Sequence, residues 1–138
     1  YKFSVIYSTD CRRISMKVLL VDDAAFVRMS LKKILDDAAF GFEYVEAGDG
    51  EEAIEKYKLY SPDLVIMDIT MPRMDGIAAV GRIKEIDDNA RIIMCSSMGY
   101  QEKVVDAITA GAKDFIIKPY EAEKVIKSVK AVLKLDKE

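Results

Sequence analysis

The chain has 138 residues, of which 51% are hydrophobic and 33% are charged, and its formal net charge at pH 7 is −3. This length favours one domain with a substantial core, and this charge gives no field that would attract nucleic acid or an acidic membrane surface. No apolar run is long enough to cross a bilayer, so we expect no membrane insertion. The sequence contains no histidine, which excludes Ser-His-Asp triads and HExxH zinc sites.

Short apolar segments alternate with segments of helical periodicity from Lys17 onward. The predicted strands cover residues 17–21, 43–47, 64–67, 91–95 and 115–117. The predicted helices cover residues 25–37, 51–60, 77–86, 101–110 and 121–133. Continuous apolar strands are typical of parallel sheets that are buried on both faces. The pattern therefore predicts an α/β fold, with a doubly wound five-stranded parallel sheet.

Residues 1–15 precede this pattern and carry no signal-peptide features. We expect them to lie outside the fold and residues 16–138 to form the domain, because terminal segments usually fray. Apolar and polar residues alternate from Tyr1 to Tyr7, so an added edge strand is the alternative. Cys11 and Cys95 fit no CxxC-type metal spacing, and we expect reduced thiols in a cytoplasmic protein.

Polar side chains follow four of the predicted strands. Asp22 and Asp23 follow the first strand, Asp68 the third, Ser96 the fourth and Lys118 the fifth. The carboxyl ends of parallel strands share one edge of the sheet, and ligand sites form there. Taken singly, each residue has an ordinary explanation, such as a helix N-cap for an aspartate. Their joint placement at one edge instead indicates a site.

The three acids need a compensating cation. Two carboxylates about 4 Å apart repel by about 4 kcal/mol at an effective dielectric constant of 20. Lys118 supplies only one positive charge. A divalent ion with oxygen ligands would balance the remainder, and Mg²⁺ is favoured because it binds few carboxylates and leaves positions for phosphate oxygens. A metal, an amine and a hydroxyl around a carboxylate suit phosphoryl transfer, with Asp68 as the candidate nucleophile.

Four segments carry a family resemblance: VLLVDD, DLVIMDITMPRMDGI, IIMCSSMG and GAKDFIIKPY. In order and spacing, residues 16–135 resemble the receiver domains of two-component response regulators. The resemblance implies a flavodoxin-like fold with strand order 2-1-3-4-5. It also implies a monomeric signalling domain that catalyses only its own phosphorylation and dephosphorylation, and is otherwise not an enzyme.

The resemblance further implies individual roles. Asp68 would accept a phosphoryl group from a phosphohistidine of a sensor histidine kinase. Mg²⁺ would be bound by Asp23, Asp68 and the backbone carbonyl of Thr70, with Asp22 acting through water. Lys118, preceding a cis proline, would pair with the phosphoryl oxygens.

The implied switch has two further residues and a surface. Ser96 would bond the phosphoryl group, and Phe115 would rotate into the space that this movement vacates. Phe115 stands where many relatives have tyrosine. Because phenylalanine has no hydroxyl, this side chain cannot report the switch through a hydrogen bond. The output surface, formed by the fourth helix, fifth strand and fifth helix, would include Gln101, Val104, Ile108 and Tyr120. A stand-alone receiver of this pattern most often serves chemotaxis, acting on a flagellar switch.

Other functions stay open at this stage. The chain could be a phosphorelay shuttle or the receiver of a larger regulator. A phosphatase of the haloacid-dehalogenase type would need a second acid two residues after Asp68, where Thr70 stands. Arg28, Lys32 and Lys33 on the first predicted helix form either a kinase-docking face or an ordinary solvated face.

Overall fold

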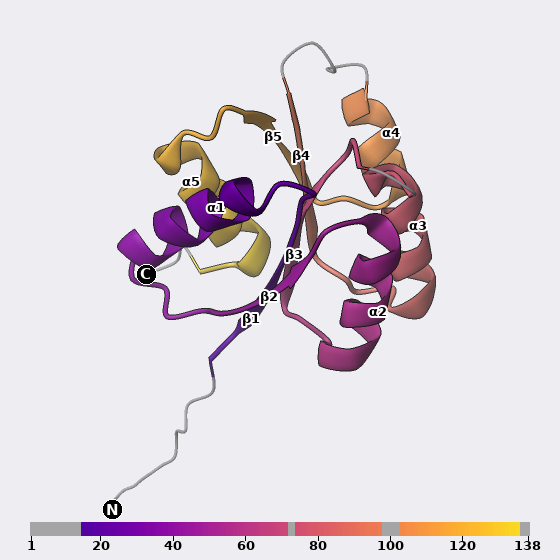
Figure 1. The fold of residues 1–138 in the computed structure, drawn as a ribbon, viewed down its shortest axis with the longest axis horizontal. Coiled ribbons are helices and arrows are strands. Elements are labelled where there is room, and N and C mark those ends of the chain that lie inside the picture. Colours follow the sequence, from indigo (N-terminus) through magenta and orange to yellow (C-terminus); the bar gives the residue numbers. More distant parts are fainter. Residues whose placement is uncertain (1–14, 72–73, 98–102, 136–138) are drawn as a thin grey trace, which may run out of the picture.

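In a computed structural model, which describes residues 15–71, 74–97 and 103–135, the chain forms a parallel sheet between two layers of helices (Figure 1). The strands are β1 (Lys17–Val21), β2 (Glu43–Ala47), β3 (Leu64–Asp68), β4 (Ile92–Ser97) and β5 (Asp114–Lys118). The helices are α1 (Ala25–Asp37), α2 (Gly50–Tyr60), α3 (Gly76–Ile86), α4 (Lys103–Ala110) and α5 (Ala122–Leu133). The strand order is β2-β1-β3-β4-β5, which confirms the predicted fold and its order.

The two faces of the sheet have separate cores. Helices α1 and α5 cover one face and α2, α3 and α4 cover the other (Figure 1). Under α1 and α5, the packed side chains include Leu20, Leu31, Leu35, Ile66, Ile93, Val125 and Val129. Under the other three helices, they include Leu19, Ile54, Val65, Met67, Val80, Ile83 and Met94. The central strands are therefore buried on both faces, which explains their unbroken apolar sequences.

The predicted boundaries differ from the observed ones mainly in β4. This strand continues past the apolar segment to Ser97, because Ser96 and Ser97 pair with Ile117 and Lys118 of β5. The ladder thus carries two hydroxyl side chains to the edge of the sheet. The predictions for residues 1–14 and for the first turn of the fourth helix lie outside the described residues.

Side chains at the starts of two helices define where those helices begin. Asp49 precedes α2 and accepts a hydrogen bond from the Glu52 backbone N–H (2.8 Å), while Glu52 accepts one from the Gly48 N–H (2.8 Å). Asp75 precedes α3 and accepts from the Ala78 N–H (2.9 Å). Each contact satisfies an N–H that has no partner within the helix. Of the helices within the described ranges, none is long and apolar enough to span a membrane.

Candidate functional site

Three aspartates meet at the carboxyl edge of the sheet. Asp22 and Asp23 follow β1, Asp68 ends β3, and one carboxylate oxygen from each lies within 4.8 Å of the others. Asp22 and Asp68 are 3% and 7% exposed, whereas Asp23 is exposed. The predicted convergence is therefore present, with two buried acids and one acid that faces solvent.

Lys118 brings a positive charge to these acids from the end of β5. Its Nζ donates to Asp22 Oδ2 at 2.9 Å and lies 3.3 Å from Asp68 Oδ1. Burial lowers the pKa of the Lys118 ammonium, but its hydrogen bond to Asp22 and the charges of both aspartates outweigh this effect, so the net pKa is raised. Lys118 is therefore a permanent cation at this edge.

Asp68 is the acid whose protonation is most disturbed. Burial raises the pKa of its carboxyl, Lys118 opposes this rise, and the neighbouring charges of Asp22 and Asp23 add to it, giving a value of about 6. One lysine thus does not compensate for three converging acids. A further cation would stabilise the ionised, nucleophilic form of Asp68.

The two adjacent aspartates have different surroundings. Asp22 Oδ1 accepts from the Ala24 N–H (2.9 Å), Asp22 Oδ2 accepts from Lys118, and the Asp22 N–H donates to the Ala47 carbonyl (3.1 Å). Helix α1 begins after Ala24 without a side-chain cap, so the N-cap interpretation of these acids does not apply. Among the described residues, the Asp23 carboxylate has no hydrogen-bond or ion-pair partner. Within the described part of the chain, the Asp23 carboxylate is therefore available as a metal ligand.

The turn after β3 passes very close to the Asp68 backbone. Thr70 is exposed in this turn, and the Gly76 N–H donates to the Ile69 carbonyl (2.7 Å). A Cβ added at Gly76 would lie 2.2 Å from the Asp68 carbonyl oxygen and 2.7 Å from Met94 Cε. Only glycine allows this approach.

Ser96 and Phe115 lie on the same face of the sheet. Phe115 pairs with Met94 in the β4–β5 ladder, and Ser96 follows Met94 by two residues. Ser96 is 2% exposed, and its hydroxyl donates to the Ser97 carbonyl at 3.3 Å. Phe115 is half-buried against the core beneath α2, α3 and α4. Both side chains therefore lie on the face that α2, α3 and α4 cover.

The predicted output surface is only partly exposed. Ile108 is 46% exposed and Val104 is half-buried, while Gln101 lies outside the described residues. Tyr120 is half-buried and packs against the core beneath α1 and α5. Val105, 70% exposed on α4, was missed, although the helical periodicity around it could have identified it.

The basic residues of α1 do not form a free cationic face. Arg28 Nε and Lys32 Nζ contact the Glu46 carboxylate at 2.7 and 2.5 Å, and Lys33 Nζ lies 3.2 Å from Asp37. The hydrogen bond from Lys32, followed by that from Arg28, lowers the pKa of Glu46. The role of Glu46 was not predicted, because its partners lie on a different element.

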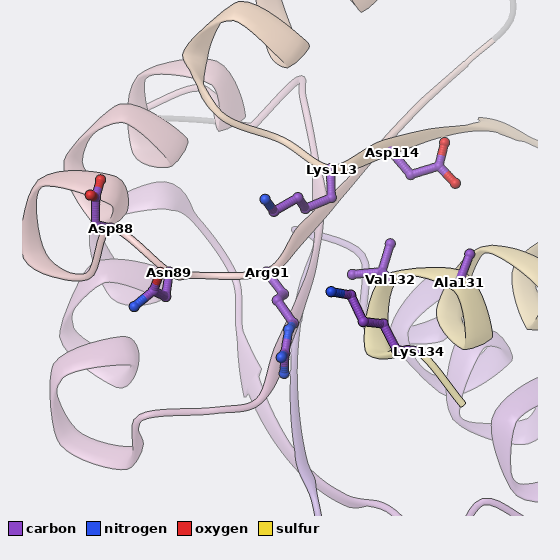
Figure 2. A pocket seen from close by; sticks show the side chains of 8 residues that line it. All are labelled: Asp88, Asn89, Arg91, Lys113, Asp114, Ala131, Val132 and Lys134. Carbon is purple, nitrogen blue, oxygen red and sulfur yellow. The ribbon is translucent and has the colours of Figure 1, made fainter. Parts of the chain in front are cut away.

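A cavity of about 600 Å³ opens at the opposite edge of the sheet, where β4 and β5 begin. In Figure 2 the cationic groups of Arg91, Lys113 and Lys134 face this cavity, while the carboxylates of Asp88 and Asp114 point away. The cavity contains no converging carboxylates and no activated nucleophile. The aspartate edge, and not this cavity, is therefore the candidate functional site.

The donor atoms at the aspartate edge suit magnesium. All are oxygens, which hard divalent cations prefer. The nearby thiol of Cys95 is fully buried in the core beneath α1 and α5, and burial raises its pKa to about 12. The exposed Asp23 beside the buried Asp68 leaves room for an ion that keeps several waters.

Residues 18–130 match the response regulator receiver domain family. The chain belongs to this family, whose members act in phosphorelay signalling and bind Mg²⁺ through an acidic pocket. It is 59% identical over 118 residues to the chemotaxis protein CheY of Bacillus subtilis, covering 85% of this chain and 97% of that protein. It is 55% identical to CheY of Thermotoga maritima, covering 86% of this chain and 98% of that protein.

Solved structures agree with this assignment. CheY in the CheX-CheY-BeF3-Mg+2 complex from Borrelia burgdorferi matches with a TM-score of 0.78 and 44% identity, covering 85% of this chain and 88% of that chain. The receiver domain of NtrX from Brucella abortus matches with a TM-score of 0.79 and 34% identity, covering 85% and 98% respectively.

Proposed function

We propose that Asp68 accepts a phosphoryl group from the phosphohistidine of a sensor kinase. An oxygen of the Asp68 carboxylate forms the new P–O bond, the P–N bond of the donor breaks, and its electron pair returns to the imidazole. The observation that carries this proposal is the convergence of Asp22, Asp23 and Asp68 within 4.8 Å beside Lys118. The chain would itself catalyse this transfer and the later hydrolysis.

The metal site would use part of this cluster. Asp23, Asp68 and the Thr70 backbone carbonyl would bind Mg²⁺ directly, and Asp22 would act through water because its carboxylate already accepts two hydrogen bonds. When bound, the ion supplies positive charge to the phosphoryl oxygens. Lys118 would hold the same oxygens from the other side.

Phosphorylation would then change the surface of α4, β5 and α5. Ser96 would turn its hydroxyl from the Ser97 carbonyl to the phosphoryl group, and Phe115 would move inward on the same face. The exposed Ile108 on α4 would contribute to the altered surface.

The similarity to chemotaxis CheY proteins supports a role in chemotaxis, with a flagellar switch protein as the target. A phosphorelay shuttle would instead pass the phosphoryl group to a second histidine protein. The test is to incubate the chain with beryllofluoride and Mg²⁺ and to measure its binding to each kind of partner. Activation-dependent binding of a flagellar protein supports chemotaxis, and binding of a histidine phosphotransfer protein alone contradicts it.

Asp23→Ala should weaken Mg²⁺ binding about tenfold, because it removes an exposed carboxylate ligand that has no hydrogen-bond or ion-pair partner among the residues the structure describes. Isothermal titration of the metal-free protein measures this change. Asp37→Ala, which removes an exposed aspartate of α1, is the matched control and should bind Mg²⁺ as the natural chain does. Unchanged affinity in the Asp23 variant would remove this residue from the metal site.

Lys118→Ala should leave slow phosphorylation but prevent the surface change, because the ammonium would no longer draw the phosphoryl group toward β5. The amide resonances of Val104 and Ile108, compared with and without beryllofluoride, report this change. Lys113→Ala, at the opposite edge of the sheet, should respond like the natural chain. A full shift of the α4 resonances in the Lys118 variant would refute its coupling role.

A further inference from the structure

Arg28 links three elements beside the acidic cluster. Its Nε donates to Glu46 Oε1 of β2 at 2.7 Å, and its Nη1 donates to the backbone carbonyl of Asp22. The Arg28 side chain is only 17% exposed, so these bonds are shielded from water. A guanidinium suits this place because its rigid fork serves two acceptors at once.

The Asp22 carbonyl belongs to the peptide unit that joins Asp22 to Asp23. This unit is planar, so the direction of its carbonyl also sets the direction of the Asp23 N–H and the relative positions of the two Cα atoms. The preceding amide is held as well, because the Asp22 N–H donates to Ala47 of β2. Arg28 then holds the carbonyl of the next peptide unit, the one that joins Asp22 to Asp23.

Glu46 anchors Arg28 and is itself held in place. Lys32 Nζ contacts its other carboxylate oxygen at 2.5 Å, and Lys56 Nζ donates to its backbone carbonyl at 2.9 Å. The hydrogen bonds from Lys32 and Arg28 stabilise the carboxylate and lower the pKa of Glu46. Without Lys32, Glu46 keeps its contacts with Arg28 and Lys56, whereas loss of the Glu46 carboxylate removes one of the two acceptors that orient Arg28.

We infer that Arg28 is a positioning residue for the acid pair: through the Asp22 carbonyl it orients Asp22 and Asp23 for Mg²⁺. This inference rests on the proposed metal site and adds to it a residue that contacts neither the ion nor the phosphoryl group. Groups of this kind commonly change metal affinity by about 10- to 100-fold when removed. Because Arg28 acts through the backbone, we expect the lower end of this range.

The test compares Arg28→Met, Arg28→Lys, Glu46→Gln and the control Lys32→Met. Mg²⁺ titration should show about tenfold weaker binding for Arg28→Met and a smaller loss for Glu46→Gln. Arg28→Lys should not restore affinity, because a single ammonium cannot serve both acceptors. Lys32→Met removes only the contact of Lys32 with Glu46 and leaves the Arg28 hydrogen bonds in place. This variant should bind Mg²⁺ with the affinity of the natural chain.

A second measurement needs no metal. The carbonyl ¹³C resonance of Asp22 should move in Arg28→Met and Glu46→Gln and stay in place in Lys32→Met. The double variant Arg28→Met/Glu46→Gln should bind Mg²⁺ no more weakly than Arg28→Met, because both changes break one chain of contacts.

Natural affinity in a folded Arg28→Met protein would overturn the inference, and so would an equal loss in Lys32→Met. If Arg28→Met does not fold, Arg28→Lys and Glu46→Gln decide in the same way. Failure of the proposed function gives a different result: the natural chain would then not bind Mg²⁺, while the Asp22 resonance would still report its contact with Arg28.

Discussion

We expect Asp68→Asn to abolish phosphorylation of the chain by acetyl phosphate and Mg²⁺. The substitution keeps the size of the side chain but removes the anionic oxygen that attacks phosphorus. Burial and the nearby acids already raise the pKa of Asp68 to about 6, so the reacting carboxylate depends on its cations. Intact mass spectrometry should show one phosphoryl adduct on the natural chain and none on Asp68→Asn.

Asp106→Asn provides the matched control, because Asp106 is an exposed acid on α4. This variant should take up one phosphoryl group as the natural chain does. A phosphoryl adduct of unchanged yield on Asp68→Asn would move the acceptor to another residue and refute the assignment.

Gly76→Ala should lower the free energy of unfolding by about 3 kcal/mol. The new Cβ would lie 2.2 Å from the Asp68 carbonyl oxygen, and a backbone atom at the end of β3 cannot move aside easily. The strain should also displace Asp68, so phosphorylation should slow in the molecules that remain folded. Urea denaturation gives the stability, and the rate with acetyl phosphate gives the effect on the site.

Gly81→Ala is the control within the same helix. A Cβ at Gly81 would meet nothing within 4 Å, so the change should raise stability by about 0.5–1 kcal/mol through helix propensity. If both glycine variants had the stability of the natural chain, the close approach of α3 to the Asp68 backbone would not matter energetically.

Much of this fold could be predicted from one sequence because the signal is local. The strands are short apolar runs, and the helices have one apolar stripe each, so the predicted elements fall on the observed ones. Asp22, Asp23, Asp68 and Lys118 could be proposed together from the sequence because each stands at the carboxyl end of a predicted strand. The carboxyl ends of parallel strands lie at one edge of the sheet, so these residues are predicted to lie at that edge without any knowledge of side-chain contacts.

Other features depend on register and packing, which no local pattern contains. Two adjacent aspartates have identical chemistry in the sequence, yet Asp22 is buried and Asp23 is exposed. The pairing of Arg28 with Glu46 requires that β2 lies beside β1 and that α1 brings Arg28 within reach of β2. The helical periodicity of α1 did not predict the contact between Arg28 and Glu46.

The sequence by itself determined which elements form, which edge of the sheet carries the acids and which residue type could accept a phosphoryl group. These properties follow from hydrophobic periodicity and from strand ends, which are local. Only the tertiary structure decided how the acids divide into a buried and an exposed member, that Gly76 must touch the Asp68 backbone, and that Arg28 holds the Asp22 carbonyl. The reason is physical: burial and hydrogen-bond partners come from elements distant in the chain, and they exist only once the layers pack.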